Sequence, residues 1–177
     1  MAYWAQGVHA DTVSAGLLIG RLVVGLGMAA HGSQKLFGWF GGKGLSGTSG
    51  YFESLGFRPG RVFATLAGIG EFTSGLLVAF GFLGPVGPAL MMAVMIVAAA
   101  QSWNKGFFAM NGGIELPCLY ASAALALAFI GPGRFSLDAA LGIAPWSNLK
   151  LVAVAVGVAV VGAAGSLAVR PPAPAPP

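Results

Sequence analysis

Two ionisable residues inside an apolar stretch are the clearest chemical signal in this sequence. Arg21 and His31 lie within a run at residues 13–37, which is long enough to cross a bilayer because a span takes roughly 20 apolar residues. A charge in the bilayer interior costs at least ~2.5 kcal/mol, so such side chains should face protein partners rather than lipid. Other apolar segments carry the acidic residues Glu71 and Glu115. We therefore expect a buried polar site shared by several membrane spans.

Depths estimated at ~1.5 Å per residue from the ends of the spans divide these residues into two groups. Arg21 and Glu71 are predicted to pair deep in the bundle. His31, Glu115 and Gln101 are predicted to share a level near one end. Histidine titrates near neutral pH and can donate a hydrogen bond to a quinone oxygen, while a glutamate exchanges the second proton.

This grouping predicts His31 and Glu115 as catalytic residues, and Arg21, Glu71 and Gln101 as substrate-binding residues. The alternative interpretation is that both groups only neutralise buried charge and fix the packing of the helices. A quinone is the electron acceptor that the first interpretation implies.

A metal or haem centre is not expected. The chain has one cysteine, Cys118, and two histidines, His9 and His31. A single cysteine excludes a cysteine-rich metal site and an intramolecular disulfide, and one intramembrane histidine cannot ligate haem from both sides. Methionines in the segment 86–103 are typical of flexible core packing.

Composition predicts the elements that must position these residues. Hydrophobic residues make up 56% of the 177 residues and charged residues 8%, whereas a soluble domain is about 25% charged. The basic residues are scattered, which argues against nucleic-acid binding. We predict an all-α polytopic membrane bundle of four core helices plus a fifth, carboxyl-terminal one. The predicted spans are residues 13–37, 62–83, 86–103, 114–130 and 149–169.

Four regions follow from these spans: an amino-terminal segment (1–12), the bundle (13–141), the additional helix (149–169) and a Pro-rich tail (170–177) expected to be disordered. Short surface helices are predicted at 48–57 and near 136–141. Gly16 and Gly20 form a GxxxG pattern, which can let membrane helices approach closely. In a chain with 29 glycines we interpret it as a chance match.

Basic residues also predict an orientation, because cytoplasmic loops of membrane proteins are enriched in Lys and Arg. The loop between the first two spans carries Lys43 and is flanked by Lys35, Arg58 and Arg61. We expect a multi-pass protein of the inner (plasma) membrane with the amino terminus outside and the carboxyl terminus cytoplasmic. The expected aromatic belts are Trp39 and Trp103 inside, and Trp4 and Trp146 outside.

Several motifs in this chain resemble the DoxX family of small bacterial membrane proteins. The resemblance covers about residues 13–141 and is sharpest at residues 131–138. Family members usually have four spans, so the fifth helix and the tail depart from the pattern. The matching motifs are Arg21, His31-Gly32-Ser33-Gln34-Lys35-Leu36, Gly41-Gly42, Gly70-Glu71-Phe72, Gly75-Leu76-Leu77, Gly81, Gly113-Ile114-Glu115-Leu116 and Gly131-Pro132-Gly133-Arg134-Phe135-Ser136-Leu137-Asp138.

The resemblance implies a membrane subunit of a redox system, linking sulfur or thiol oxidation to the quinone pool. The family is similar to the small subunit of a thiosulfate:quinone oxidoreductase, and one member is associated with a sulfurtransferase and a superoxide dismutase in oxidant defence. Besides the bilayer, a sulfurtransferase or other redox protein is therefore the implied partner, and any sulfur chemistry belongs to it. The alternatives are a non-catalytic anchor that recruits redox-defence enzymes, and a small-solute transporter. The sequence leaves open whether the chain is an enzyme or a homo-oligomer.

Overall fold

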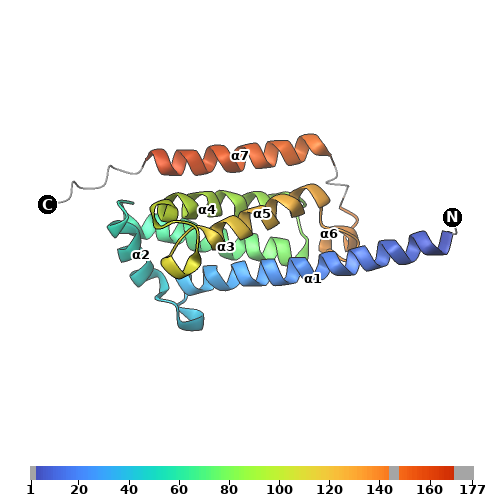
Figure 1. Ribbon diagram of the computed structural model, residues 1–177, viewed down its shortest axis with the longest axis horizontal. Helices are drawn as coiled ribbons and strands as arrows, with labels where there is room; N and C mark the ends of the chain where they lie inside the picture. Colours follow the sequence, from blue (N-terminus) through green and yellow to red (C-terminus); the bar gives the residue numbers. More distant parts are fainter. Residues whose placement is uncertain (1–2, 144–147, 170–177) are drawn as a thin grey trace.

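The structure, a computed structural model, describes residues 3–143 and 148–169, with side chains from residue 10 onward. Within these residues the chain forms helices and no strand. The predicted all-α bundle is confirmed: the long helices run side by side, with two short helices at opposite ends (Figure 1). The long helices are α1 (Tyr3–Leu36), α3 (Gly60–Phe80), α4 (Val86–Ser102), α5 (Glu115–Ile130) and α7 (Leu149–Ala168), and the short ones are α2 (Gly44–Ser54) and α6 (Leu137–Ala140).

Each predicted span overlaps one of the long helices. Four segments are long and apolar enough to cross a membrane, and they belong to α1, α3, α4 and α7. Helix α5 is shorter, with 16 residues, or about 24 Å at 1.5 Å per residue. Apolar composition and length together identify the chain as a membrane protein.

Helix α1 begins earlier than the apolar run alone indicates. It starts at Tyr3 and continues without interruption to Leu36, because no proline occurs in this stretch to break it. Its first turns project past the rest of the bundle (Figure 1). The tail 170–177 and the side chains of Trp4, His9 and Trp146 lie outside the described residues.

The helices pack in a simple order: α1 on α3, α3 on α4, and α4 on both α5 and α7. Successive long helices alternate in direction, so the bundle has two chemically distinct ends (Figure 1). The α2 end contains α2, the end of α1 and the loop between α4 and α5. The α6 end contains α6, the turn between α3 and α4, and the start of α7.

Glycines bring the backbones of α1 and α3 into direct contact. A Cβ atom on Gly25 would lie 2.6 Å from the carbonyl oxygen of Gly75, and one on Gly32 would lie 2.7 Å from that of Gly68. Such distances are shorter than van der Waals contact, so only glycine allows this approach, as at other small-residue membrane interfaces. In contrast, a Cβ atom on Gly16 or Gly20 would meet nothing within 4 Å, so their GxxxG pattern makes no close helix contact within the described part of the chain.

Small residues and methionines fill the centre of the bundle, where Met28 of α1 meets Met91, Met92 and Met95 of α4. The prediction that the α4 methionines serve packing is therefore confirmed. Helix α2 begins at Gly44, four residues before the expected start at residue 48, because it packs along the beginning of α3. Tertiary contacts of this kind outweigh the low helix propensity of glycine.

Candidate functional site

The glycine contact between α1 and α3 decides which polar residues share a level. Since Gly25 lies beside Gly75 and Gly32 beside Gly68, the antiparallel register places His31 level with Glu71. Arg21 is ten residues, or about 15 Å, further along α1. The predicted pairing of Arg21 with Glu71 is therefore wrong. The depth estimate failed because the first turns of α3 extend past the end of α1 to meet α2.

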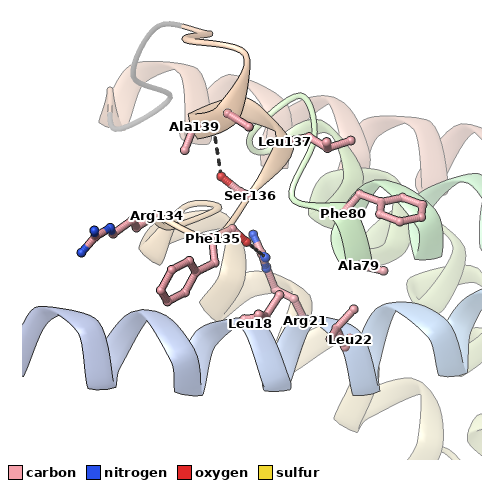
Figure 2. A pocket seen from close by; sticks show the side chains of 11 residues that line it. Leu18, Arg21, Leu22, Ala79, Phe80, Arg134, Phe135, Ser136, Leu137 and Ala139 are labelled. Atoms are coloured by element: carbon pink, nitrogen blue, oxygen red, sulfur yellow. Dashed lines mark hydrogen bonds between the residues drawn. The ribbon is translucent and has the colours of Figure 1, made fainter.

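Arg21 instead joins three segments at the α6 end, although its side chain is only 2% exposed. Its guanidinium donates hydrogen bonds to the carbonyl oxygens of Pro132 and Phe135. Figure 2 shows Arg21 rising from α1 toward the chain around Phe135, whereas Arg134 points away. A Cβ atom on Gly81, where α3 ends, would collide with the same guanidinium. We call this arrangement the Arg21 junction.

Asp138 completes the Arg21 junction from the opposite side. Its carboxylate accepts hydrogen bonds from the backbone N–H groups of Leu83 (2.9 Å) and Gly84 (2.7 Å) in the turn between α3 and α4. It is also the acidic group that acts electrostatically on Arg21. Ser136 caps α6 by accepting a hydrogen bond from the N–H of Ala139 (Figure 2). Residues 131–138, where the family resemblance is sharpest, thus connect α1 to the turn between α3 and α4.

A cavity of about 600 Å³ lies beside this junction. Its lining is mostly apolar, and Arg21 reaches it alongside Leu18, Leu22 and Phe80 (Figure 2). The two terminal nitrogens of the guanidinium bond to backbone carbonyls, so the geometry favours a structural role for Arg21 over substrate binding. The buried Nε has no hydrogen-bond partner among the described residues.

A second group of polar residues surrounds a cavity of about 130 Å³ toward the α2 end. We call it the His31 pocket. The polar residues come from α1, α3 and α5, and the apolar walls from α1, α4 and α5. The lining residues are Met28, His31, Lys35, Glu71, Met95, Ala98, Leu116, Pro117 and Tyr120.

A buried ion pair forms one side of the His31 pocket. Lys35 Nζ lies 2.5 Å from Glu71 Oε2, with the lysine side chain 28% exposed and that of Glu71 5% exposed. Lys35 lines the pocket, and its ammonium group points to the buried carboxylate rather than to water. The ion pair offsets the desolvation cost of the Glu71 carboxylate, which would be large for an unpaired charge in an apolar helix.

His31 and Tyr120 form the opposite side of the pocket. Their rings meet edge to face with centroids 5.9 Å apart, and a Cβ atom on Gly27 would lie 2.6 Å from the tyrosine hydroxyl. Within the described residues, neither the imidazole nor this hydroxyl makes a hydrogen bond to another residue. Both side chains interact electrostatically with Glu71. The pocket therefore combines a carboxylate in an ion pair with two side chains whose polar hydrogens are not bonded to another of the described residues.

Glu115 and Gln101 do not join His31 in this pocket, contrary to the predicted grouping. Glu115 begins α5 and accepts a hydrogen bond from the backbone N–H of Ala109 (2.7 Å), which holds the preceding loop. Gln101 lies one turn beyond Ala98 on α4, and its buried Nε2 has no hydrogen-bond partner among the described residues. The carboxylate level with His31 is that of Glu71, because the glycine contacts between α1 and α3 fix how the two helices are offset along their axes.

Sequence reasoning missed Lys35 and Tyr120 as members of the site. A signal existed for Lys35, which follows His31 by four residues and therefore lies on the same face of α1. Tyr120 carried no comparable signal, since its position depends on how α5 lies across α4 and α1.

Comparison with known proteins supplies the family. No curated protein and no solved structure matches this chain. The DoxX family model matches residues 16–104, which covers half of the chain and includes His31, Lys35 and Glu71 of the pocket. This match, together with four helices long and apolar enough to cross a membrane, shows that the chain is a membrane protein of the DoxX family.

Proposed function

We propose that the chain is the membrane subunit of a redox system and that the His31 pocket takes the ring of a quinone. The observation that carries this proposal is the meeting of His31, Lys35, Glu71 and Tyr120 around one partly open, membrane-level cavity. Perturbable groups that converge on a cavity are the usual mark of a functional site.

The size and walls of the pocket fit a single ring. Its volume of about 130 Å³ is close to the ~150 Å³ of an engineered apolar cavity that binds benzene. Met28 and Met95 supply flexible apolar walls, and thioether side chains adapt well to flat ring surfaces. His31 and the Tyr120 hydroxyl stand at the edge as hydrogen-bond donors for a carbonyl oxygen.

Proton transfer is the chemistry that these residues would perform. Reduction of a quinone to a quinol consumes two electrons and two protons. His31 would deliver one proton to a carbonyl oxygen, take up another from the α2 end through the Lys35–Glu71 pair, and deliver this second proton to complete the quinol. General acid–base help of this kind typically contributes a factor of about 10²–10⁴ in rate.

The electrons must come from another protein or from a small sulfur compound. Oxidation of two thiols to a disulfide releases two electrons and two protons, which balances the reduction of one quinone. The chain has one cysteine, Cys118, so the dithiol would belong to a partner such as a sulfurtransferase. Thiosulfate is the other candidate donor, since two thiosulfate ions release two electrons when they join as tetrathionate.

The test is quinone-dependent oxidation of thiosulfate, sulfide or a dithiol by membrane vesicles, normalised to the amount of this chain. We expect His31→Ala to lower the rate by about 100-fold or more. Tyr120→Phe removes one hydroxyl and keeps the ring contact, so we expect a smaller loss. Glu115→Gln is the matched acidic control, because that carboxylate holds a loop outside the pocket.

A non-catalytic anchor predicts a different pattern. In that case His31→Ala and Tyr120→Phe would leave both the redox rate and recruitment of the partner unchanged at equal abundance. Wild-type rates in both variants would overturn the proposal. A loss in Glu115→Gln as large as that in His31→Ala would move the chemistry away from this pocket.

A further inference from the structure

The loop between α4 and α5, residues 103–114, carries several large apolar side chains that are exposed. Met110 is 90% exposed, and the exposed fractions of Trp103, Phe107 and Phe108 lie between 53% and 68%. The rings of Phe107 and Phe108 meet edge to face, with centroids 5.4 Å apart. Large apolar side chains that are exposed together usually mark a contact surface. We call this segment, which lies at the α2 end of the bundle (Figure 1), the α4–α5 loop.

The backbone of the α4–α5 loop folds back on itself and makes many of its own hydrogen bonds. The N–H groups of Ile114 and Glu115 donate to the carbonyl oxygens of Gly106 (3.1 Å) and Phe107 (2.8 Å). A Cβ atom on Gly113 would lie 2.3 Å from the carbonyl oxygen of Gly106, so the two limbs of the loop are in direct contact. Further N–H groups, at residues 111–113, donate to the carbonyl oxygens of residues 108 and 109.

This internal bonding favours lipid over water, or a soluble partner, as the surroundings of the loop. In water an irregular loop can bond its N–H and C=O groups to solvent, whereas in a bilayer each unsatisfied group is costly. Glu115 fits the same pattern, because its carboxylate turns to the backbone N–H of Ala109 at 2.7 Å and satisfies a donor that the loop itself leaves open.

The exposed apolar side chains of the loop continue onto the exposed side of α5. Phe107 is bonded to the first residue of α5, and the exposed apolar residues that follow on this helix are Leu116 and Leu119. Helix α5 has 16 residues, or about 24 Å, which is less than the hydrocarbon core of about 30 Å. A bilayer that covers α5 therefore also reaches the segments that flank it.

Polar side chains in the same loop indicate the depth at which it lies. Asn104, Lys105 and Asn111 are exposed, and within the described residues Lys105 makes no ion pair. A cation and amides without partners do not suit the hydrocarbon core. Trp, Phe and Met side chains next to a lysine are typical of segments in the interfacial layer, where headgroups meet acyl chains.

We propose that the α4–α5 loop is immersed in the interfacial layer of the bilayer, with its phenylalanines and Met110 against the acyl chains and Lys105 among the lipid phosphates. The partner of this surface is lipid and not a protein. Leu116 and Pro117 follow the loop directly and line the His31 pocket. The immersed loop thus holds one wall of that pocket at the membrane surface.

The test is tryptophan fluorescence of the full chain in phosphatidylcholine vesicles whose acyl chains are brominated either near the headgroup or near the middle. Phenylalanine replaces the four native tryptophans, and Met110→Trp supplies a single probe. Bromine quenches a tryptophan that it contacts, whereas iodide, present on both sides of the membrane, quenches from water. We expect the largest loss of Met110→Trp emission with bromines near the headgroup, and only a small loss with iodide.

Two matched probes calibrate the depth. Ser46→Trp lies on the exposed face of α2 at the same end of the bundle, so iodide should quench it strongly and bromines weakly. Leu125→Trp lies on the exposed side of α5, near its middle, so bromines near the middle of the acyl chain should quench it most. Phe108→Trp, a second probe in the loop, should respond like Met110→Trp.

A response of the two loop probes like that of Ser46→Trp would overturn the proposal, because it would place the loop in water, free for a soluble partner. Strongest quenching by bromines near the middle of the chain would place the loop in the hydrocarbon core and would also overturn it. Circular dichroism of each variant confirms that the helices have formed. Fluorescence is read without any redox assay, so its outcome is independent of the proposed quinone chemistry.

Discussion

One face of α1 carries a buried cation, Arg21, and a partly buried one, Lys35, and each is stabilised at its own end of the bundle. Arg21 and Lys35 are fourteen residues apart, which is close to four full helical turns, so both point away from lipid toward the other helices. Arg21 interacts with backbone carbonyls and Asp138, and Lys35 with Glu71. Each cation therefore needs a different acidic partner, and the two sites should respond separately to mutation.

Replacement of Asp138 tests the Arg21 junction. Asp138→Ala leaves the N–H groups of Leu83 and Gly84 without their acceptor and removes the counter-charge of Arg21. We expect a loss of about 2–6 kcal/mol in the free energy of unfolding, because two backbone donors that lose their acceptor cost about 1–3 kcal/mol each. Arg134→Ala is the control, because its ion pair with Asp11 is exposed and should contribute ~1 kcal/mol or less. Thermal unfolding in detergent measures both, and equal losses would contradict the assigned role of Asp138.

A double-mutant cycle tests which basic residue Glu71 interacts with. Lys35→Met and Glu71→Gln should be coupled by about 0.5–3 kcal/mol in unfolding free energy, because the two side chains form one ion pair. Arg21→Met and Glu71→Gln should be additive within ~0.5 kcal/mol, as expected for residues more than ~10 Å apart. Coupling in the second cycle with none in the first would refute the observed register of α1 against α3.

At the level of helices, the glycine contact between α1 and α3 controls the geometry of the site. A methyl group on Gly25 would lie 2.5 Å from the backbone nitrogen of Ala79 and 2.6 Å from the carbonyl oxygen of Gly75. The helices would have to separate, and His31 would move relative to Glu71. The same register places Arg21 at the end of α3, so one interface positions both polar groups.

Matched glycine variants test this interface. Gly25→Ala should destabilise the protein by about 1–3 kcal/mol through overpacking. Gly20→Ala, in the same helix but facing open space, should be neutral or stabilising by up to ~1 kcal/mol, because alanine favours the helix. The midpoint of thermal unfolding in detergent is the measurement. A stabilised Gly25→Ala variant would rule out direct backbone contact.

The whole molecule has an uneven distribution of basic residues between its two ends. The α2 end carries Lys35, Lys43, Arg58, Arg61 and Lys105, whereas the described part of the α6 end carries Arg134 and Lys150 outside the buried Arg21. The exposed aromatic residues Trp39 and Trp103 also lie at the α2 end. Enrichment of Lys and Arg on the cytoplasmic side is the general rule for short loops, so we propose that the α2 end is cytoplasmic.

Cysteine labelling in intact cells tests this orientation. In a Cys118→Ala background, Ser46→Cys places a thiol on exposed α2, and Ala140→Cys places one on exposed α6. A membrane-impermeant maleimide should label Ala140→Cys and leave Ser46→Cys unlabelled until the cells are opened. Labelling of Ser46→Cys in intact cells would place the α2 end outside.

The sequence by itself determined the fold class, the helix segments and the presence of buried polar residues. Hydrophobicity and length are local properties, and they suffice for spans such as residues 86–103, because an apolar run of that length has few other stable structures in a membrane. Pro and Gly at the segment ends likewise indicated where helices stop. The need for partners around Arg21 and His31 also followed directly, since unpaired charges in the membrane are costly.

Only the tertiary structure decided which partners those residues have. The register of α1 against α3 decides that Arg21 bonds to the carbonyl oxygens of Pro132 and Phe135 instead of Glu71, and that Glu71 pairs with Lys35. That register is set by backbone contact at Gly25, Gly32 and Gly75, and in a chain with 29 glycines their spacing does not identify which ones make contact. Distances along single helices cannot supply this information, because the offset between two helices is a property of the interface that both of them form.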